Sequence, residues 1–191
     1  MKKFKIIPVI LAAVLSLSAV GCSGKVDKTE TSISHTPLIN NEGTADNETT
    51  ISVGEETSVN DTSFVLNRVI DSGEKPQEGG GTYYYLDVTI RNLTDISYGL
   101  NALNNFYVLT SDGNEYHFDV RTQLYAINNI ENYLPNPFEV PSNGEISGIV
   151  GGFVVPENTE NLTVCFFPSK DDINNKSDVI KVDVTSSDIT K

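Results

Sequence analysis

One histidine and one cysteine in the body of the chain are of the types that nucleophilic catalysis uses. His117 lies in an alternating stretch with Glu115 and Asp119, and Cys165 lies within another apolar stretch. A thiol beside an imidazole base would be an activated nucleophile. The residues around His117 and Cys165 give no sign of such a pair. A cysteine inside a strand is most often a small, buried apolar side chain. We therefore expect this protein not to be an enzyme.

Acidic residues are abundant, but their spacing fits no established metal site. The sequence from Asp112 superficially matches a calcium loop, which has Gly at its sixth position and Glu at its twelfth. Those positions are His117 and Gln123 here, so a tight turn explains the segment. A second group, which suits either a weak surface calcium ion or a solvated loop, consists of Asp171, Asp172, Asn174, Asn175 and Asp178. One histidine and one cysteine are too few for structural zinc, and we expect no cofactor.

The other cysteine, Cys22, ends an N-terminal segment of a different character. Lysines precede an apolar run over residues 6–20, which is shorter than the about 20 residues of a transmembrane helix. A basic start, a short apolar core and small residues before a cut are typical of a secretory signal. Residues 17–22 (LSAVGC) resemble the signal peptide of a bacterial lipoprotein, in which cleavage leaves a lipidated cysteine at the new N-terminus.

Two interpretations of Cys22 differ in where the protein stays. A lipidated Cys22 would carry two acyl chains (palmitate, for example). Each methylene buried in the bilayer contributes about 0.8 kcal/mol to membrane binding, so two chains form a stable anchor. An ordinary secretory signal, cut near Ala19 or Gly21, would leave Cys22 incidental and the protein free to diffuse. We expect a lipid anchor on the extracytoplasmic face of the cell membrane. Cys165 then has no partner for an intrachain disulfide.

The charge of the chain limits its partners. The formal net charge is −13 at pH 7. Nucleic-acid binding requires Lys and Arg against the phosphates, so this composition argues against a nucleic-acid partner. Strong acidity also keeps an extracellular domain soluble and repels anionic surfaces.

Composition and periodicity divide the chain into four parts. After a leader at residues 1–21, residues 22–50 are polar and predict a disordered tether. Residues 51–185 contain short alternating runs separated by turns, and residues 186–191 are expected to be a flexible tail. The clearest run is 82–92, where the even-numbered residues from 84 to 90 are apolar or tyrosine and the odd-numbered ones are polar or tyrosine.

Other runs add turn and bulge signals. Residues 106–110 and 115–119 flank an Asp-Gly turn, which is a strong hairpin signal. Residues 146–155 contain Gly148, Gly151 and Gly152, which indicate a bulge or a close backbone approach. Several short strands at such spacing predict an all-β protein, an immunoglobulin-like antiparallel β-sandwich with one core.

An ordered set of motifs within this region resembles a known family. The motifs are VGE at 53–55, TSFVL at 62–66, YYYLDVTIRN at 83–92, FYVLTSDGNEY at 106–116, PSNGE at 141–145 and GFVVP at 152–156. Together they resemble an uncharacterised domain of Gram-positive lipoproteins, related to secreted immunoprotective antigens. The resemblance implies an immunoglobulin-like fold and an extracytoplasmic location. It implies no catalytic residues, because none are established for that family.

Two features are candidates for a binding surface. Tyr83 and Tyr85, with Arg91, are expected to form an exposed aromatic row on the polar face of 82–92, unless cross-strand packing covers the rings. The segment 120–139, which includes Tyr125 and Tyr133, is longer than the family pattern and is either a binding element or a cap on one open end of the sandwich.

The apolar residues of 120–139 also allow a short helix. Leu124, Ile127 and Glu131 stand at helical spacing. The favoured function is a lipid-anchored domain that binds an envelope or extracellular protein or a glycan through its surface. The alternative is a small-molecule or metal-binding accessory lipoprotein, with residues 120–139 covering a pocket.

Overall fold

The computed structural model describes residues 47–168 and 178–191. The leader, Cys22 and most of the expected tether lie outside the described residues, as does most of the acidic cluster at 171–178. Within the described ranges, no helix is both long and apolar enough to cross a membrane.

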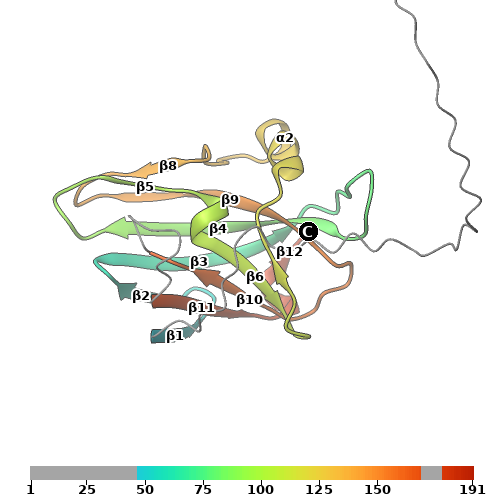
Figure 1. Ribbon diagram of the computed structural model, residues 1–191, viewed down its shortest axis with the longest axis horizontal. Coiled ribbons are helices and arrows are strands. Elements are labelled where there is room, and N and C mark those ends of the chain that lie inside the picture. Colours follow the sequence, from blue (N-terminus) through green and yellow to red (C-terminus); the bar gives the residue numbers. More distant parts are fainter. Residues whose placement is uncertain (1–46, 169–177) are drawn as a thin grey trace, which may run out of the picture. The chain divides into compact units, whose positions relative to one another are not determined.

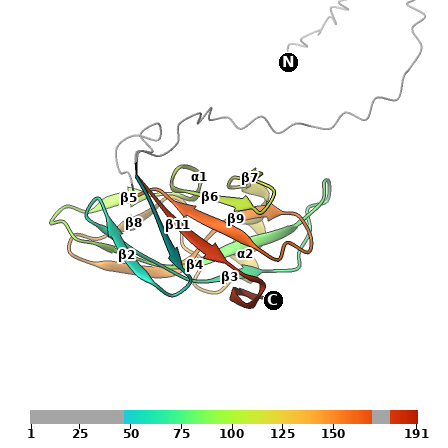
Figure 2. The same ribbon diagram turned by 90° about the horizontal axis from the view of Figure 1, so that it is seen from below.

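The first sheet has five strands in the order β1, β11, β10, β6, β7. Their bounds are β1 Asn47–Ser52, β11 Asp178–Val184, β10 Leu162–Phe166, β6 Phe106–Thr110 and β7 Glu115–Tyr116. All neighbours are antiparallel except β1 and β11, which lie side by side and run in the same direction (Figure 2). The expected hairpin between β6 and β7 is confirmed.

The second sheet faces the first and has the order β12, β3, β4, β9, with β2 also paired to β3 (Figure 1). Its strands are β2 Glu56–Val59, β3 Thr62–Asp71, β4 Thr82–Asn92, β9 Glu145–Val155 and β12 Ile189–Thr190. A small third sheet pairs β5 Tyr98–Leu100 with β8 Phe138–Val140. The helices are α1 Ala102–Asn105, α2 Val120–Asn129 and a 3₁₀ turn at Ser186–Asp188.

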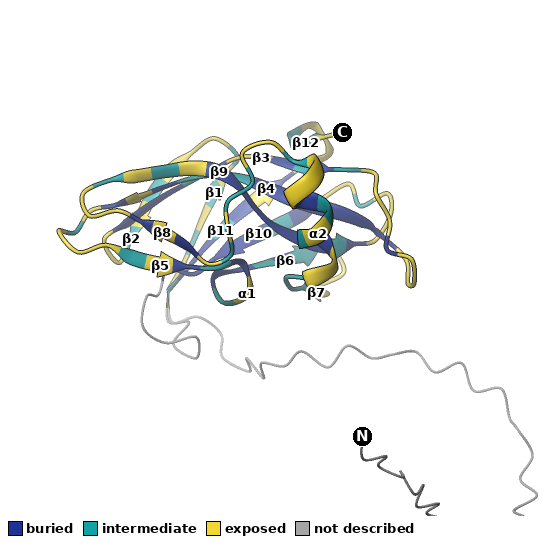
Figure 3. Cartoon of the chain, turned by 90° about the horizontal axis from the view of Figure 1, so that it is seen from above, coloured by how far each residue is buried: buried dark blue, intermediate teal, exposed yellow. Residues whose placement is uncertain are grey.

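Alternating side chains from the two large sheets form the main core. In β4 the even-numbered side chains from Tyr84 to Ile90 are buried there, as the period-two pattern predicts. Phe64 of β3 stacks on Phe166 of β10 with ring centroids 4.4 Å apart, which joins the two layers. Buried segments therefore run along the middle of both sheets (Figure 3). The predicted immunoglobulin-like β-sandwich is confirmed.

The glycine-rich strand β9 contains the expected bulge. Tyr84 of β4 pairs with Phe153 of β9, and the next residue of β4, Tyr85, pairs with Gly151. Gly152 therefore has no partner in β4 and is the extra residue of the bulge. Gly151 has φ +108°, which disfavours other residues. A Cβ on Gly152 would lie 2.5 Å from the Tyr84 carbonyl oxygen, so the close backbone approach also requires glycine.

The domain boundaries differ from those expected at both ends. β1 begins at Asn47, before the expected start at residue 51, because its backbone pairs with β11. Ile189 and Thr190 pair with Val69 and Ile70 of β3, so they belong to the second sheet and not to a flexible tail. Short strands with few apolar residues give little periodic signal.

Candidate interaction surface

The helix α2 is the element that shapes this surface, and the sequence explains where it begins and ends. The Asp119 carboxylate caps the first turn by accepting from the Arg121 backbone N–H at 2.9 Å. At the other end the Ile130 N–H bonds to the Ala126 carbonyl oxygen, after which Asn132 adopts φ 58° and the helix cannot continue. The short helix allowed by the sequence is thus present.

This helix lies against the outer face of the second sheet. It contacts β9, and Ala126 packs in a second cluster with Tyr83, Tyr85 and Ile149. These side chains point away from the main core, because β4 alternates its faces. The first part of the segment 120–139, as far as Tyr133, therefore covers a sheet face. Leu134 and Phe138, further along the same segment, pack against the main core between the sheets instead.

Tyrosine rings fill the space between α2 and β4. Tyr85 lies 6.4 Å from Tyr125 and 6.3 Å from Tyr133 between ring centroids, and Tyr83 lies 5.9 Å from Tyr125. Tyr85 is completely buried and Tyr83 is 7% exposed, whereas Tyr125 and Tyr133 are half-buried. The expected exposed aromatic row is therefore wrong, because α2 and the segment after it cover both β4 tyrosines.

Hydrogen bonds fix the helix to the bulge in β9. Tyr85 Oη donates to the Thr122 carbonyl oxygen at 2.9 Å, and Tyr133 Oη donates to the Gly151 carbonyl oxygen. Thr122 Oγ1 accepts from the Gly152 N–H at 3.0 Å and donates to the Asp119 carbonyl oxygen at 2.6 Å. Buried polar groups need such partners, so the bulge and the helix start are mutually dependent.

Burial also changes the acidity of these phenols. It raises the pKa of Tyr133 to about 12, and it raises the pKa of Tyr85 further, with the neighbouring tyrosines adding to the effect. Both groups stay protonated over the physiological range, as donation to carbonyl oxygens requires.

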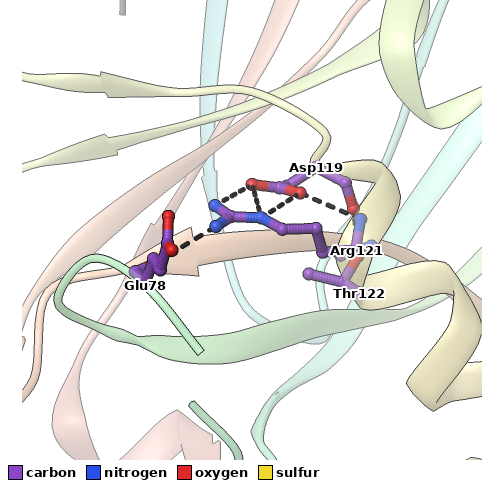
Figure 4. A network of polar contacts seen from close by, with 5 residues as sticks. Glu78, Asp119, Arg121 and Thr122 are labelled. Carbon is purple, nitrogen blue, oxygen red and sulfur yellow. Dashed lines mark hydrogen bonds and ion pairs between the residues drawn. The ribbon is translucent and has the colours of Figure 1, made fainter. Parts of the chain in front are cut away.

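An arginine joins the helix start to the glycine-rich connection between β3 and β4 (Figure 4). Arg121 Nη2 lies 2.6 Å from Asp119 Oδ2, and Arg121 Nε also donates to this carboxylate. Arg121 Nη1 donates to the Glu78 carbonyl oxygen at 3.2 Å. The hydrogen bond with Asp119 raises the pKa of Arg121. This guanidinium is thus committed to internal contacts.

Arg91, the fifth sequence candidate, lies apart from the tyrosines. It is exposed and forms an ion pair with Glu145 of β9 at 2.8 Å. Arg91 is six residues along β4 from Tyr85, which is about 20 Å in an extended strand. The structure therefore does not bring the arginine and the tyrosine cluster into one surface. Arg68 is likewise paired, with Asp87 at 2.9 Å.

The outer side of α2 carries exposed apolar side chains. Val120 is 67%, Leu124 72% and Ile127 62% exposed. At about 100° per residue these three positions share one side, opposite the buried Thr122 and Ala126. We call Val120, Leu124 and Ile127 the α2 ridge. Fully burying a Val, Leu or Ile side chain contributes about 1.5–3 kcal/mol, so covering the ridge would contribute several kcal/mol.

The sequence of α2 contains apolar residues at helical spacing, but periodicity alone does not show which of them face solvent. Residues 120–130 have two apolar sets, one at 120, 124 and 127 and the other at 125, 126 and 130. A surface helix on a sheet can bury only one of them. Only the tertiary contacts show that the second set is inside.

The catalytic and metal candidates gain no support from the geometry. Cys165 is completely buried with Phe167 and Val179, and burial raises the pKa of its thiol to about 12. His117 Nε2 lies 3.3 Å from Glu115 Oε2. Within residues 47–168 and 178–191, no three His, Cys, Asp or Glu side chains come together in a way that would hold a metal ion.

Comparison with known families assigns the domain. A sequence model described as "Domain of unknown function (DUF4352)" matches residues 51–178. The chain belongs to the DUF4352 family. The match begins within β1 and ends at the first residue of β11, so it spans most of the sandwich of this DUF4352 domain. No curated protein matches the chain.

Solved structures resemble this DUF4352 domain in fold. The yjhA protein from Bacillus subtilis is 16% identical, with 69% of this chain and 98% of that chain covered and a TM-score of 0.49. The secreted protein MPT63 from Mycobacterium tuberculosis is 14% identical, with 69% and 95% covered and a TM-score of 0.44. An uncharacterized β-sandwich protein from Clostridium difficile is 12% identical, with 75% and 99% covered and a TM-score of 0.42.

Proposed function

We propose that this DUF4352 protein is a lipid-anchored, extracytoplasmic interaction domain, and not an enzyme, and that it binds a partner through the α2 ridge. The observation that carries the proposal is the exposure of Val120, Leu124 and Ile127 on a helix that is firmly held from below. Exposed apolar groups on a rigid helix are typical of helix-in-groove recognition, which uses anchors at i, i+4 and i+7. The partner is an envelope or extracellular protein.

The location in this proposal rests on the leader. The basic start, the short apolar run and the small residues before Cys22 support export and acylation at that cysteine. β1 begins beside the start of β11, where Asn47 Nδ2 donates to Asp178 Oδ1 at 2.8 Å. The helix α2 packs instead near the bulge in the C-terminal half of β9.

The anchor is tested by replacing Cys22. In the Cys22→Ser variant the protein should move from the membrane fraction to the medium or the soluble envelope fraction, because the acyl chains are lost. A variant that remains in the membrane fraction to the same extent as the parent would remove the lipid anchor from the proposal. The Cys165→Ser variant is the control, since that buried thiol has no role in anchoring.

The binding surface is tested by photocrosslinking on intact cells. A photoreactive residue at Leu124 should give reproducible adducts with a defined protein, and the adducts should diminish when Val120 and Ile127 are replaced by Ser. The same residue at Ser147, which is exposed on β9, is the matched control. Equal labelling from both positions, or none from Leu124, would argue against the α2 ridge as a binding surface.

A further inference from the structure

We propose that residues 118–134 act as a strap that takes the place of a neighbouring strand along β9 and keeps this edge of the second sheet closed to strand addition. β9 is the last strand in the order of its sheet, so β4 pairs with one of its edges and no described strand pairs with the other. The backbone groups along such an edge can pair with an extended segment of another chain. The inference concerns the inner side of the strap, so it does not depend on what the α2 ridge binds.

The strap pairs with the backbone groups of β9 that point away from β4. The Ile149 N–H donates to the Asn132 carbonyl oxygen at 3.0 Å, and the Ile149 carbonyl oxygen accepts from the Leu134 N–H at 2.8 Å. Further along β9, the Gly152 carbonyl oxygen accepts from the Asp119 N–H at 2.9 Å. Both ends of the strap thus supply contacts that a neighbouring strand would otherwise make.

The two ends of the strap run in opposite directions along β9. Tyr133 forms a parallel bridge with Ile149, and Phe118 forms an antiparallel bridge with Phe153. The helix α2 connects these two single bridges over the outer face of the sheet. Because neither bridge extends into a strand, the strap ends the sheet without creating a new edge.

Gly148 shows that the sequence of β9 accommodates the strap. A Cβ at Gly148 would lie 2.7 Å from the Asn132 carbonyl oxygen and 2.7 Å from Leu134 Cδ2, which is closer than Cβ atoms approach other heavy atoms. Glycine in a strand often marks a place where another backbone comes close. Gly148 therefore serves the strap, whereas Gly151 and Gly152 serve the bulge.

The composition of β9 explains why its edge needs a cover. Residues 146–155 contain no charged residue and no proline, and Ile, Val and Phe make up most of the run. Natural sheets protect an edge with charges, prolines, bulges or a covering segment, and a long apolar edge without them pairs with other chains. After Glu145, β9 has only the bulge and the strap for this purpose.

Hydrogen exchange, measured by NMR on the full-length protein in detergent micelles, tests whether the strap closes the edge. Thr122→Val removes the acceptor of the Gly152 N–H, and Tyr133→Phe removes the other side-chain hydrogen bond to β9. In the double variant the amide hydrogens of Ile149 and Gly152 should exchange at least about tenfold faster than in the parent, while that of Val88 in β4 changes little. Tyr133→Phe alone, which keeps the ring contacts, replaces the double variant if the latter does not fold.

The matched control is Ile180→Val, which removes one methylene from the main core in the first sheet. It lowers stability without touching the strap, so the exchange of Ile149 and Gly152 should not increase relative to that of Val88. A strap variant that behaved like this control would show that the strap contributes stability alone, and edge protection would be overturned.

A labelled peptide with the sequence of residues 82–92 tests strand addition directly, since this sequence pairs with β9 in the fold. Fluorescence anisotropy should show that the peptide binds the strap variant at least about tenfold more tightly than it binds the parent or the Ile180→Val control. If Ile149 and Gly152 exchanged faster and the peptide still bound no better, the edge would not be a strand-addition site and the proposal would fail.

Discussion

Tyr85 and Thr122 are joined by a hydrogen bond of 2.9 Å, in which the phenol oxygen of a core strand donates to a carbonyl oxygen in the first turn of α2. Tyr85 is completely buried, and so is Thr122. The bond shows that the outer face of β4 is an interior surface at this point. It also explains why α2 can hold its opposite side, the α2 ridge, rigidly toward solvent.

Replacing Tyr85 with Phe should destabilise the domain by about 0.5–1.5 kcal/mol, because the hydrogen bond to the Thr122 carbonyl oxygen is lost while the ring contacts remain. Urea unfolding measures the change. The Tyr83→Phe variant is the control, since Tyr83 is at the border of the same cluster and still slightly exposed. A Tyr85→Phe protein as stable as the parent would show that the bond contributes nothing.

Adding a methyl group at Gly152 should be more damaging than adding one at Gly80. The new Cβ at Gly152 would meet the Tyr84 carbonyl oxygen at 2.5 Å and a Tyr85 ring carbon at 2.8 Å. We expect Gly152→Ala to lower the free energy of unfolding by about 1–3 kcal/mol. At Gly80 nothing lies within 4 Å, so Gly80→Ala should change it by less than about 0.5 kcal/mol. Thermal melts of the two variants provide the comparison.

Alkaline pH should unfold the domain through its buried tyrosines. The pKa of Tyr133 is raised from 10.0 to about 12, and that of Tyr85 is also raised, both mainly by burial. Their contribution to stability is thus fully present below pH 10. Above pH 10 the unfolded chain releases protons that the folded chain retains, so the free energy of unfolding falls as pH rises toward 12.

Denaturant titrations at several alkaline pH values, with tyrosinate absorbance as a second signal, test this dependence. The Tyr133→Phe variant should show a shallower loss of stability with pH, because one titrating group is gone. Stability that stays constant between pH 9 and pH 12 would contradict the burial of these phenols.

Cys165 should resist thiol reagents in the folded protein. Its side chain is completely buried and burial raises its pKa to about 12, so neither access nor thiolate is available near neutral pH. In the Cys22→Ser background, where no other cysteine remains, labelling should be slow without denaturant and rapid in concentrated urea. Rapid labelling of the native protein would show that β10 opens readily.

Much of the sandwich was predictable because strands alternate their faces. The even-numbered residues from 84 to 90 could be assigned to the core, and the glycines of 146–155 to a bulge or a close backbone approach, from local pattern alone. The candidate site was much less predictable. Period two shows that Tyr83 and Tyr85 share a face, but it cannot show that residues some forty positions later will cover that face.

The sequence by itself determined the alternation of the long strands, the hairpin at Asp112-Gly113 and the acidity of the chain, and it allowed a short helix within residues 120–139, because each depends on neighbouring residues. The tertiary structure decided which apolar set of that helix is inside. The contacts of Tyr85, Thr122 and Gly152 join three distant segments, and such contacts leave no periodic trace. They make Tyr85 a core residue and leave Leu124, which the sequence did not distinguish as a surface residue, exposed to solvent.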